Sequence, residues 1–195
     1  MSANPKQIWT PESYLEFERA SETKHEFYRG EVFDMSGASF THTVIAVNTT
    51  RELSSQLRKK PCTVHSNDLR IQVRAAGLFT YPDVIVICGE PRFLDKRNDT
   101  VTNPTLIIEV LSKSTESYDR GKKFQHYRTL ETLQEYVLIS QDSANIERFT
   151  RQPGGDWLLS AASGLDATVT LASVGCTLAL ADVYEKVDFE EQTET

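Results

Sequence analysis

Two acidic residues stand at strand-like sequences, where their types and positions indicate chemistry. Asp83 opens the apolar run Val84–Cys88, and Glu109 interrupts the run Leu106–Leu111. A carboxylate in a buried strand is costly unless it is paired or coordinates a metal ion. If the two strands are neighbours, both carboxylates, a strand carbonyl and water form a hard-oxygen site suited to Mg²⁺ or Mn²⁺. The alternative stays open that Asp83 faces solvent and that Glu109 pairs with an arginine.

A helical sequence after the second acid adds a cation. Asp119, Lys123 and Tyr127 are spaced four residues apart, which places them on one face of a helix. Because this helix follows Glu109 after a short loop, that face could lie over the carboxylates. Lys123 could there orient or deprotonate a water, or stabilise charge in a phosphoryl transition state. An ordinary ion pair on a solvated helix is the alternative, and the neighbouring Lys122 competes for the role.

The elements that must position these residues indicate one mixed α/β (α+β) domain. Its central sheet is flanked by helices and ends in an antiparallel meander, an order that argues against strict βα alternation. The alternation around Leu69, Ile71 and Val73 predicts one solvated strand face that carries Arg70 and Arg74. The predicted helices cover residues 10–19, 41–59, 118–130 and 182–187, and the predicted strands cover a 25–32 hairpin, 62–74, 84–88, 106–108, 135–140, 145–150 and 157–161.

Composition places the chain among globular proteins. It has 195 residues, of which 39% are hydrophobic and 25% charged, and no internal repeat. We expect a flexible N-terminus over residues 1–9, one domain over 10–187 and an acidic flexible tail over 188–195. With no apolar run of about 20 residues and no basic start followed by an apolar stretch, we expect a cytoplasmic protein that does not enter membranes.

Charge and cysteine usage narrow the possible functions. The net charge of −7 has the wrong sign for a protein that coats nucleic acid non-specifically, although residues 51–60 and 113–128 are locally positive. The three cysteines are Cys62, Cys88 and Cys176. Their odd number and the absence of a CxxC pair favour buried free thiols over a disulfide framework. The four histidines lack the spacing of a zinc site.

The series of motifs resembles the Uma-two-type family of bacterial proteins classed as restriction endonucleases, within the PD-(D/E)xK nuclease superfamily. The resemblance covers roughly residues 10–185, and the motifs come in the order of the family. The segments that carry it are Lys24–Val32, Tyr81–Val86, Pro104–Thr115, the helix with Asp119, Lys123 and Tyr127, and Glu135-Tyr136.

The resemblance implies a restriction-endonuclease-like fold and roles for particular residues. Asp83 and Glu109 would bind the metal, with the carbonyl of Val110 as a further ligand. The superfamily lysine normally lies two residues after the second acid, but that position is Leu111 here. In this family the lysine has moved to the following helix, which points to Lys123. Glu26 matches an acid of the family's first hairpin that would join the site. His42 and Asp68 also match family positions. The alternative interpretations are a polar residue at a helix N-terminus for His42 and an acid in a turn for Asp68.

The implied reaction is hydrolysis of DNA phosphodiester bonds with Mg²⁺ or Mn²⁺ as cofactor. By family analogy the protein is a homodimer. Contacts to the nucleic-acid backbone would come from basic residues near the site, namely Arg70, Arg74, Arg120 and Lys122. Two alternatives remain. One is a catalytically inactive nuclease fold that serves as a binding or regulatory module, as Leu111 and the acidic balance suggest. The other is a homodimeric structural protein with incidental acids.

Overall fold

The computed structural model describes residues 8–189, and residues 1–7 and 190–195 lie outside the described part. The helices are α1 (Pro11–Ala20), α2 (Phe40–Leu57), α3 (Glu116–Tyr118), α4 (Phe124–Tyr127) and α5 (Leu180–Val183), with a 3₁₀ turn, η1 (Arg74–Ala76), and a π-helical turn, η2 (Asp119–Lys123). The strands are β1 (His25–Tyr28), β2 (Glu31–Asp34), β3 (Cys62–Ser66), β4 (Arg70–Val73), β5 (Leu78–Thr80), β6 (Val84–Cys88), β7 (Thr100–Val101), β8 (Leu106–Leu111), β9 (Glu135–Ser140), β10 (Asn145–Arg151), β11 (Trp157–Ser163), β12 (Thr168–Leu171) and β13 (Cys176–Ala179).

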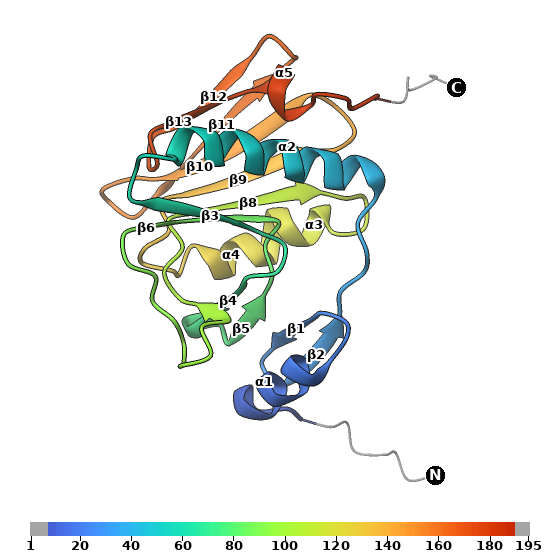
Figure 1. Cartoon of the computed structure of the whole chain (residues 1–195), viewed down its shortest axis with the longest axis vertical. Coiled ribbons are helices and arrows are strands. Elements are labelled where there is room, and N and C mark those ends of the chain that lie inside the picture. Colours follow the sequence, from blue (N-terminus) through green and yellow to red (C-terminus); the bar gives the residue numbers. More distant parts are fainter. Residues whose placement is uncertain (1–7, 190–195) are drawn as a thin grey trace.

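A six-stranded sheet of order β11-β10-β9-β8-β6-β3 forms the centre of the molecule. Helix α2 crosses one face of it, and the α3–η2–α4 segment lies on the other (Figure 1). A five-stranded sheet, β2-β1-β5-β4-β7, and the hairpin β12–β13 complete the fold. Strands β8 and β9 are parallel, whereas β9, β10 and β11 form an antiparallel meander. The predicted mixed α+β class and C-terminal meander are therefore confirmed.

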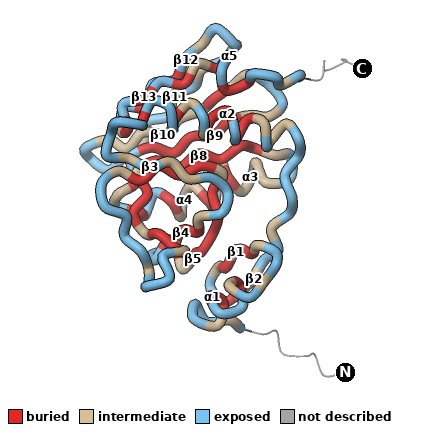
Figure 2. Tube along the Cα trace, in the orientation of Figure 1, coloured by how far each residue is buried: buried red, intermediate tan, exposed pale blue. Residues whose placement is uncertain are grey.

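Two cores lie on opposite faces of the central sheet because successive strand residues point to opposite sides. In β6, Val84 and Val86 pack in the core under α2, whereas Ile85 and Ile87 pack in the core that contains Tyr127 of α4. The middle strands are accordingly buried along their length in Figure 2, as their unbroken apolar runs predict.

Several predicted elements are confirmed with small shifts at their ends. Helix α1 begins at Pro11 after Thr10, whose hydroxyl accepts a hydrogen bond from the Ser13 N–H. This is the cap that the Thr-Pro pair predicts. The 25–32 hairpin is β1–β2, and the 41–59 helix is α2. The last helix, α5, starts before the predicted 182–187 segment.

The predicted strand 62–74 is wrong, because it is two strands in two different sheets. Strand β3 pairs with β6 in the central sheet, and β4 pairs with β5 in the other. The break falls at Asn67, whose φ of 53° turns the chain in a conformation that asparagine tolerates better than most residues. The sequence prediction also missed the short strands β5 and β7 and the β12–β13 hairpin.

The predicted flexible segments at the two termini overlap the described residues only at positions 8–9 and 188–189. Where residues 8–9 are described, the backbone N–H of Trp9 donates to the Gly30 carbonyl at 2.9 Å. At the other end, the rings of Phe189 and Tyr184 lie 5.2 Å apart. The remainder of the predicted flexible segments lies outside the described residues. No helix between residues 8 and 189 combines the length and apolarity required to cross a bilayer.

The expectation of three free thiols is wrong. Cys62 and Cys88 occupy opposite positions in the β3–β6 ladder and form a disulfide, with their Cα atoms 4.0 Å apart. The two cysteines are 26 residues apart in the sequence, with no CxxC spacing that would indicate a pair. The register of β3 and β6 brings them together. Among the described residues, Cys176 is the free cysteine, and it is buried as predicted.

We predict that this disulfide stabilises the fold by restricting the unfolded chain. Closing a loop of 26 residues contributes about 3 kcal/mol in the chain-entropy model, which corresponds to roughly 10 °C in melting temperature for a chain of this size. Reduction, or the double substitution Cys62→Ser and Cys88→Ser, should lower the melting temperature accordingly. Alkylation of the unfolded, non-reduced protein should label one thiol, and labelling of all three would contradict the pairing.

Candidate active site

Strand register brings the two acids together. Strands β6 and β8 are antiparallel neighbours, with Val84 opposite Ile108. One further step along this register places Asp83 directly opposite Glu109. The Asp83 backbone N–H lies 3.4 Å from Oε2 of Glu109 as a hydrogen-bond donor. The two acidic strands are therefore neighbours, which was the condition for their carboxylates to converge.

The alternation of β8 turns Glu109 toward the following helical segment. Its neighbours Ile107 and Leu111 belong to the core that contains Tyr127, so Glu109 shares that face. The Glu109 side chain is only 4% exposed. Its Oε1 lies 2.9 Å from Nζ of Lys123 and accepts a hydrogen bond from the Tyr127 hydroxyl at 2.8 Å.

Lys123, rather than Lys122, reaches the carboxylates. Nζ of Lys123 also lies 3.1 Å from Oδ1 of Asp119, which is four residues earlier in the chain. The predicted common face of Asp119, Lys123 and Tyr127 therefore forms. Lys122 is exposed. The predicted helix 118–130 is here α3, η2 and α4, and the site residues Asp119 and Lys123 are the ends of the π-helical turn. Such turns often occur at functional sites.

Asp83 is held on both carboxylate oxygens. Nε2 of His42 lies 2.9 Å from its Oδ1, and the Val110 backbone N–H donates to its Oδ2 at 2.8 Å. His42 is the third residue of α2, where its own N–H donates to the capping hydroxyl of Ser39. The helix N-terminal position expected for His42 is thus confirmed, and its side chain in addition binds Asp83, a contact across 41 positions.

Glu26 approaches from β1, on the side of the helical segment. The hydroxyl of Thr80 donates to its Oε1, and the hydroxyl of Tyr118 donates to its Oε2 at 3.4 Å. The Tyr118 ring centroid lies 5.9 Å from Nζ of Lys123, so Tyr118 contacts both side chains, and the charge of Glu26 contributes to the raised pKa of Lys123. The sequence did not indicate Thr80 or Tyr118 as neighbours of Glu26. Thr80 lies in β5, a strand of three residues with no alternating pattern, and Tyr118 ends the three-residue helix α3.

Burial dominates the electrostatics of this cluster. Burial, with the negative charges of Asp119 and Asp83, raises the pKa of Glu109 to about 8, although Lys123 acts in the opposite direction. For Lys123, burial acts to lower the pKa, but Glu109 and Asp119 outweigh it and hold its pKa well above the usual value. Lys123 is therefore a cation at neutral pH, and Glu109 carries a proton in much of the population.

The donor set fits a hard divalent cation in composition. No group of three or more His, Cys, Asp or Glu side chains among residues 8–189 is placed to hold a metal ion, so two carboxylates need a further oxygen. Val110 can supply it. The N–H and C=O of one strand residue point to the same side, and the Val110 N–H faces Asp83. Two carboxylates, one carbonyl and water are ligands that Mg²⁺ accepts.

The four predicted nucleic-acid contacts have different surroundings. The expected exposure of Arg70 is wrong: its side chain is 3% exposed and hydrogen-bonds Tyr81 and Thr100. Arg120 forms ion pairs with Glu116 and Glu147. Arg74 and Lys122 are exposed. Asp68 is also exposed and lies 3.0 Å from Lys24, which agrees with the interpretation as a turn acid.

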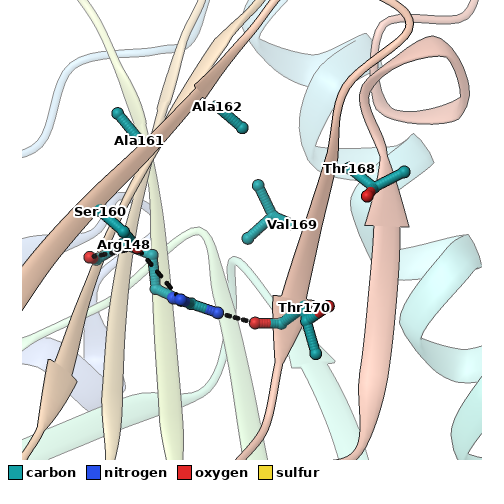
Figure 3. A pocket seen from close by; sticks show the side chains of 7 residues that line it. All are labelled: Arg148, Ser160, Ala161, Ala162, Thr168, Val169 and Thr170. Atoms are coloured by element: carbon teal, nitrogen blue, oxygen red, sulfur yellow. Dashed lines mark hydrogen bonds between the residues drawn. The ribbon is translucent and has the colours of Figure 1, made fainter.

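Two hollows lie outside this cluster. One, lined by Ser39, Thr41, Lys113 and Gln141 among others, is beside the start of α2 that carries His42. The other lies between β11 and β12, where Arg148 reaches across to the Thr170 carbonyl and the Ser160 hydroxyl (Figure 3). Strands β9 and β10 separate β11 from β8, so this second hollow is not part of the carboxylate site.

Comparisons with known proteins identify first the fold and then the family. A crystal structure described as that of a "putative nuclease belonging to DUF820" from Anabaena variabilis superposes with a TM-score of 0.72 over 90% of this chain and 97% of the other, at 18% identity. That similarity shows the fold. The model of the Uma2 family, described as "Putative restriction endonuclease", matches residues 11–181. The chain therefore belongs to the Uma2 family, whose description supports a nuclease function.

Two relatives from Synechocystis sp. extend the family assignment. The protein slr1290 is 37% identical over 92% of this chain and 93% of its own length. The protein sll1609 is 36% identical over 84% and 92%, respectively. Both are described as uncharacterized. The similarity therefore extends over nearly the whole length of both relatives, and their descriptions name no reaction.

The raised pKa of Glu109 predicts that the contribution of this residue to folding stability depends on pH. An acid with a pKa of about 8 in the folded protein and 4.5 ordinarily binds more protons when folded, so its contribution to stability falls as pH rises from about 4.5 to 8. Glu109→Gln removes this titration. Measured with a chelator present, its melting temperature should rise relative to the original protein by a few degrees between pH 5 and pH 8.

The matched control is Glu22→Gln, which changes an exposed carboxylate and should leave the pH profile unaltered. A melting-temperature difference between Glu109→Gln and the original protein that stays constant across this range would contradict the raised pKa.

Proposed function

We propose that the protein is a metal-dependent endonuclease that hydrolyses phosphodiester bonds of DNA. The observation that carries the proposal is the convergence of Asp83, Glu109 and Lys123 from two adjacent strands and one helical segment, with 2.9 Å between Lys123 and Glu109. Family membership supports the nuclease class. The cation, the substrate and the catalytic roles are inferred from the chemistry of these side chains.

Asp83, Glu109 and the carbonyl of Val110 would hold one Mg²⁺ or Mn²⁺. A cation at that position supplies Lewis-acid polarisation of a phosphoryl oxygen and lowers the pKa of bound water. His42 and the Val110 N–H fix the orientation of the Asp83 carboxylate. Tyr127 does the same for Glu109 from the helical side. These contacts place the two acids before any ligand arrives, which lowers the cost of ordering the site.

Lys123 supplies the fixed positive charge of the mechanism. Its ammonium group is buried between Glu109 and Asp119, where a charge acts more strongly than in water. Beside a phosphate it would stabilise the negative charge that develops in the transition state. The carboxylate of Glu26, which the Thr80 and Tyr118 hydroxyls fix, would accept a hydrogen bond from a water at the site and so orient it.

The substitutions that test this function keep the shape of each side chain. Asp83→Asn, Glu109→Gln and Lys123→Met should each lower the rate of Mg²⁺- or Mn²⁺-dependent cleavage of supercoiled plasmid DNA by at least about 10²-fold, the scale of a lost preorganised electrostatic group. Circular dichroism should show that the variants remain folded. Lys59→Met is the matched control, since Lys59 is exposed beyond the far end of α2, about 27 Å along an 18-residue helix.

Cleavage by Asp83→Asn at the original rate would refute the site assignment. If the original protein binds DNA but does not cut it with either metal, the inactive binding module is the correct function. The observation that favours this second candidate, the inactive binding module, is Leu111. It occupies the position of the superfamily lysine and is buried in the core.

We also propose that the protein is a homodimer, because an enzyme that cuts both strands of a symmetric site can present one site to each strand. A single chain has a mass of 22.0 kDa, and light scattering at micromolar protein concentration should give twice that mass. A monomer mass under these conditions would exclude the dimer.

A further inference from the structure

A turn beside the site carries an arginine in an unusual conformation. Arg29 and Gly30 join β1 to β2, and their φ angles of 47° and 94° are those of a type I′ turn. The first position of such a turn favours Asn, Asp or Gly, because in the left-handed region a Cβ atom lies close to the following carbonyl oxygen, a cost that Gly avoids and that Asn and Asp offset by local hydrogen bonds. A non-glycine residue held there is a reason to look for a function of its side chain.

The Arg29 side chain is held in place by contacts at its base. Its backbone N–H donates to the Gly77 carbonyl at 3.1 Å, and its Nε donates to the Ala76 carbonyl at 3.2 Å. The guanidinium carbon lies 5.4 Å from the Tyr28 ring centroid. Within residues 8–189, neither Nη group of Arg29 has a hydrogen-bond or ion-pair partner, so both can bind an external acceptor. This fork geometry matches the oxygens of a phosphate.

Two basic residues of the helical segment lie close to Arg29. The His126 ring lies 4.9 Å from the Tyr28 ring. The Tyr28 ring thus contacts both His126 and Arg29, and Lys122 precedes His126 by four residues on the same helical segment. Burial, together with the positive charges of Arg29 and Lys122, lowers the pKa of His126, although Glu26 acts in the opposite direction. Arg29 and Lys122 are exposed and His126 is half-buried. No ion pair of Lys122 occurs within the described residues, so its charge faces solvent.

This basic cluster (Arg29, Lys122 and His126) adjoins the carboxylate site on two elements. On β1, Glu26 and Tyr28 are two residues apart and share one face, about 7 Å along the strand. On the helical segment, Lys122 and His126 flank the site residues Lys123 and Tyr127. A nucleic-acid strand with one phosphate at the carboxylates would therefore place a neighbouring phosphate near the basic cluster.

We infer that Arg29, Lys122 and His126 form a phosphate-binding subsite that holds the DNA backbone beside the scissile bond. The inference rests on the proposed function for its substrate, but it assigns a binding role to residues outside the carboxylate site. It also explains how a chain with a net charge of −7 would hold a polyanion, because the cations Arg29 and Lys122, which form no ion pair within the described residues, supply local attraction, while His126 can donate a hydrogen bond.

The test exploits the turn conformation of Arg29. Asn is better suited than Arg to the first position of a type I′ turn before Gly, so Arg29→Asn should fold and melt at the same or a higher temperature. Binding of a fluorescently labelled short DNA duplex is measured by anisotropy, with a chelator present to prevent cleavage. Arg29→Asn and Lys122→Met should each weaken binding roughly tenfold and reduce the slope of log K against log salt by about 0.9.

Lys59→Met is again the control and should keep both affinity and slope. Original affinity and slope in Arg29→Asn and in Lys122→Met would overturn the subsite, while metal-dependent cleavage by the original protein would leave the proposed function standing. Binding that depends on Arg29 without any cleavage would support the subsite and refute the nuclease. Absence of DNA binding by the original protein would overturn both.

Discussion

The burial of one cation among carboxylates is the constraint on which the site depends. Lys123 and Glu109 are both more than nine-tenths buried and lie 2.9 Å apart, and removing Glu109 would leave the buried Lys123 cation with Asp119 as its remaining ion-pair partner among the described residues. Asp119 and the Tyr127 hydroxyl complete the surroundings of the pair. Strand β8 and the helical segment must therefore pack in one register, because a shift by one residue would turn Glu109 to the opposite face.

A second polar network holds the other end of the site. The Tyr81 hydroxyl donates to Glu18 of α1 at 2.8 Å and accepts from Arg70 at 2.8 Å. Glu18 in turn binds the ring and the backbone N–H of His25 in β1. Tyr81 stands two residues before Asp83, and His25 stands one before Glu26. The network thus ties the N-terminal helix and hairpin to the segment that presents Asp83, which is why Arg70 is a structural residue rather than a surface contact.

The sequence was sufficient where the signal is local. Unbroken β-branched runs identified β6 and β8, Thr10-Pro11 identified a helix start, and four-residue spacing placed Lys123 on the face of Asp119. It was insufficient where the answer depends on register or tertiary contact. Alternation in β4 predicts one solvated face, but both faces are covered at Arg70, so the predicted exposure of Arg70 is wrong. The Cys62–Cys88 pair and the His42–Asp83 contact join distant positions that only the folded strands bring together.

The central claim is that Asp83 and Glu109 together hold a divalent cation, and calorimetric titration of Mn²⁺ into the protein tests it without any assumption about substrate. The account predicts saturable binding by the original protein and by the exposed-site control Glu22→Gln, and loss of that binding in both Asp83→Asn and Glu109→Gln. Undiminished binding in the two variants, or no binding by the original protein, would contradict a two-carboxylate metal site.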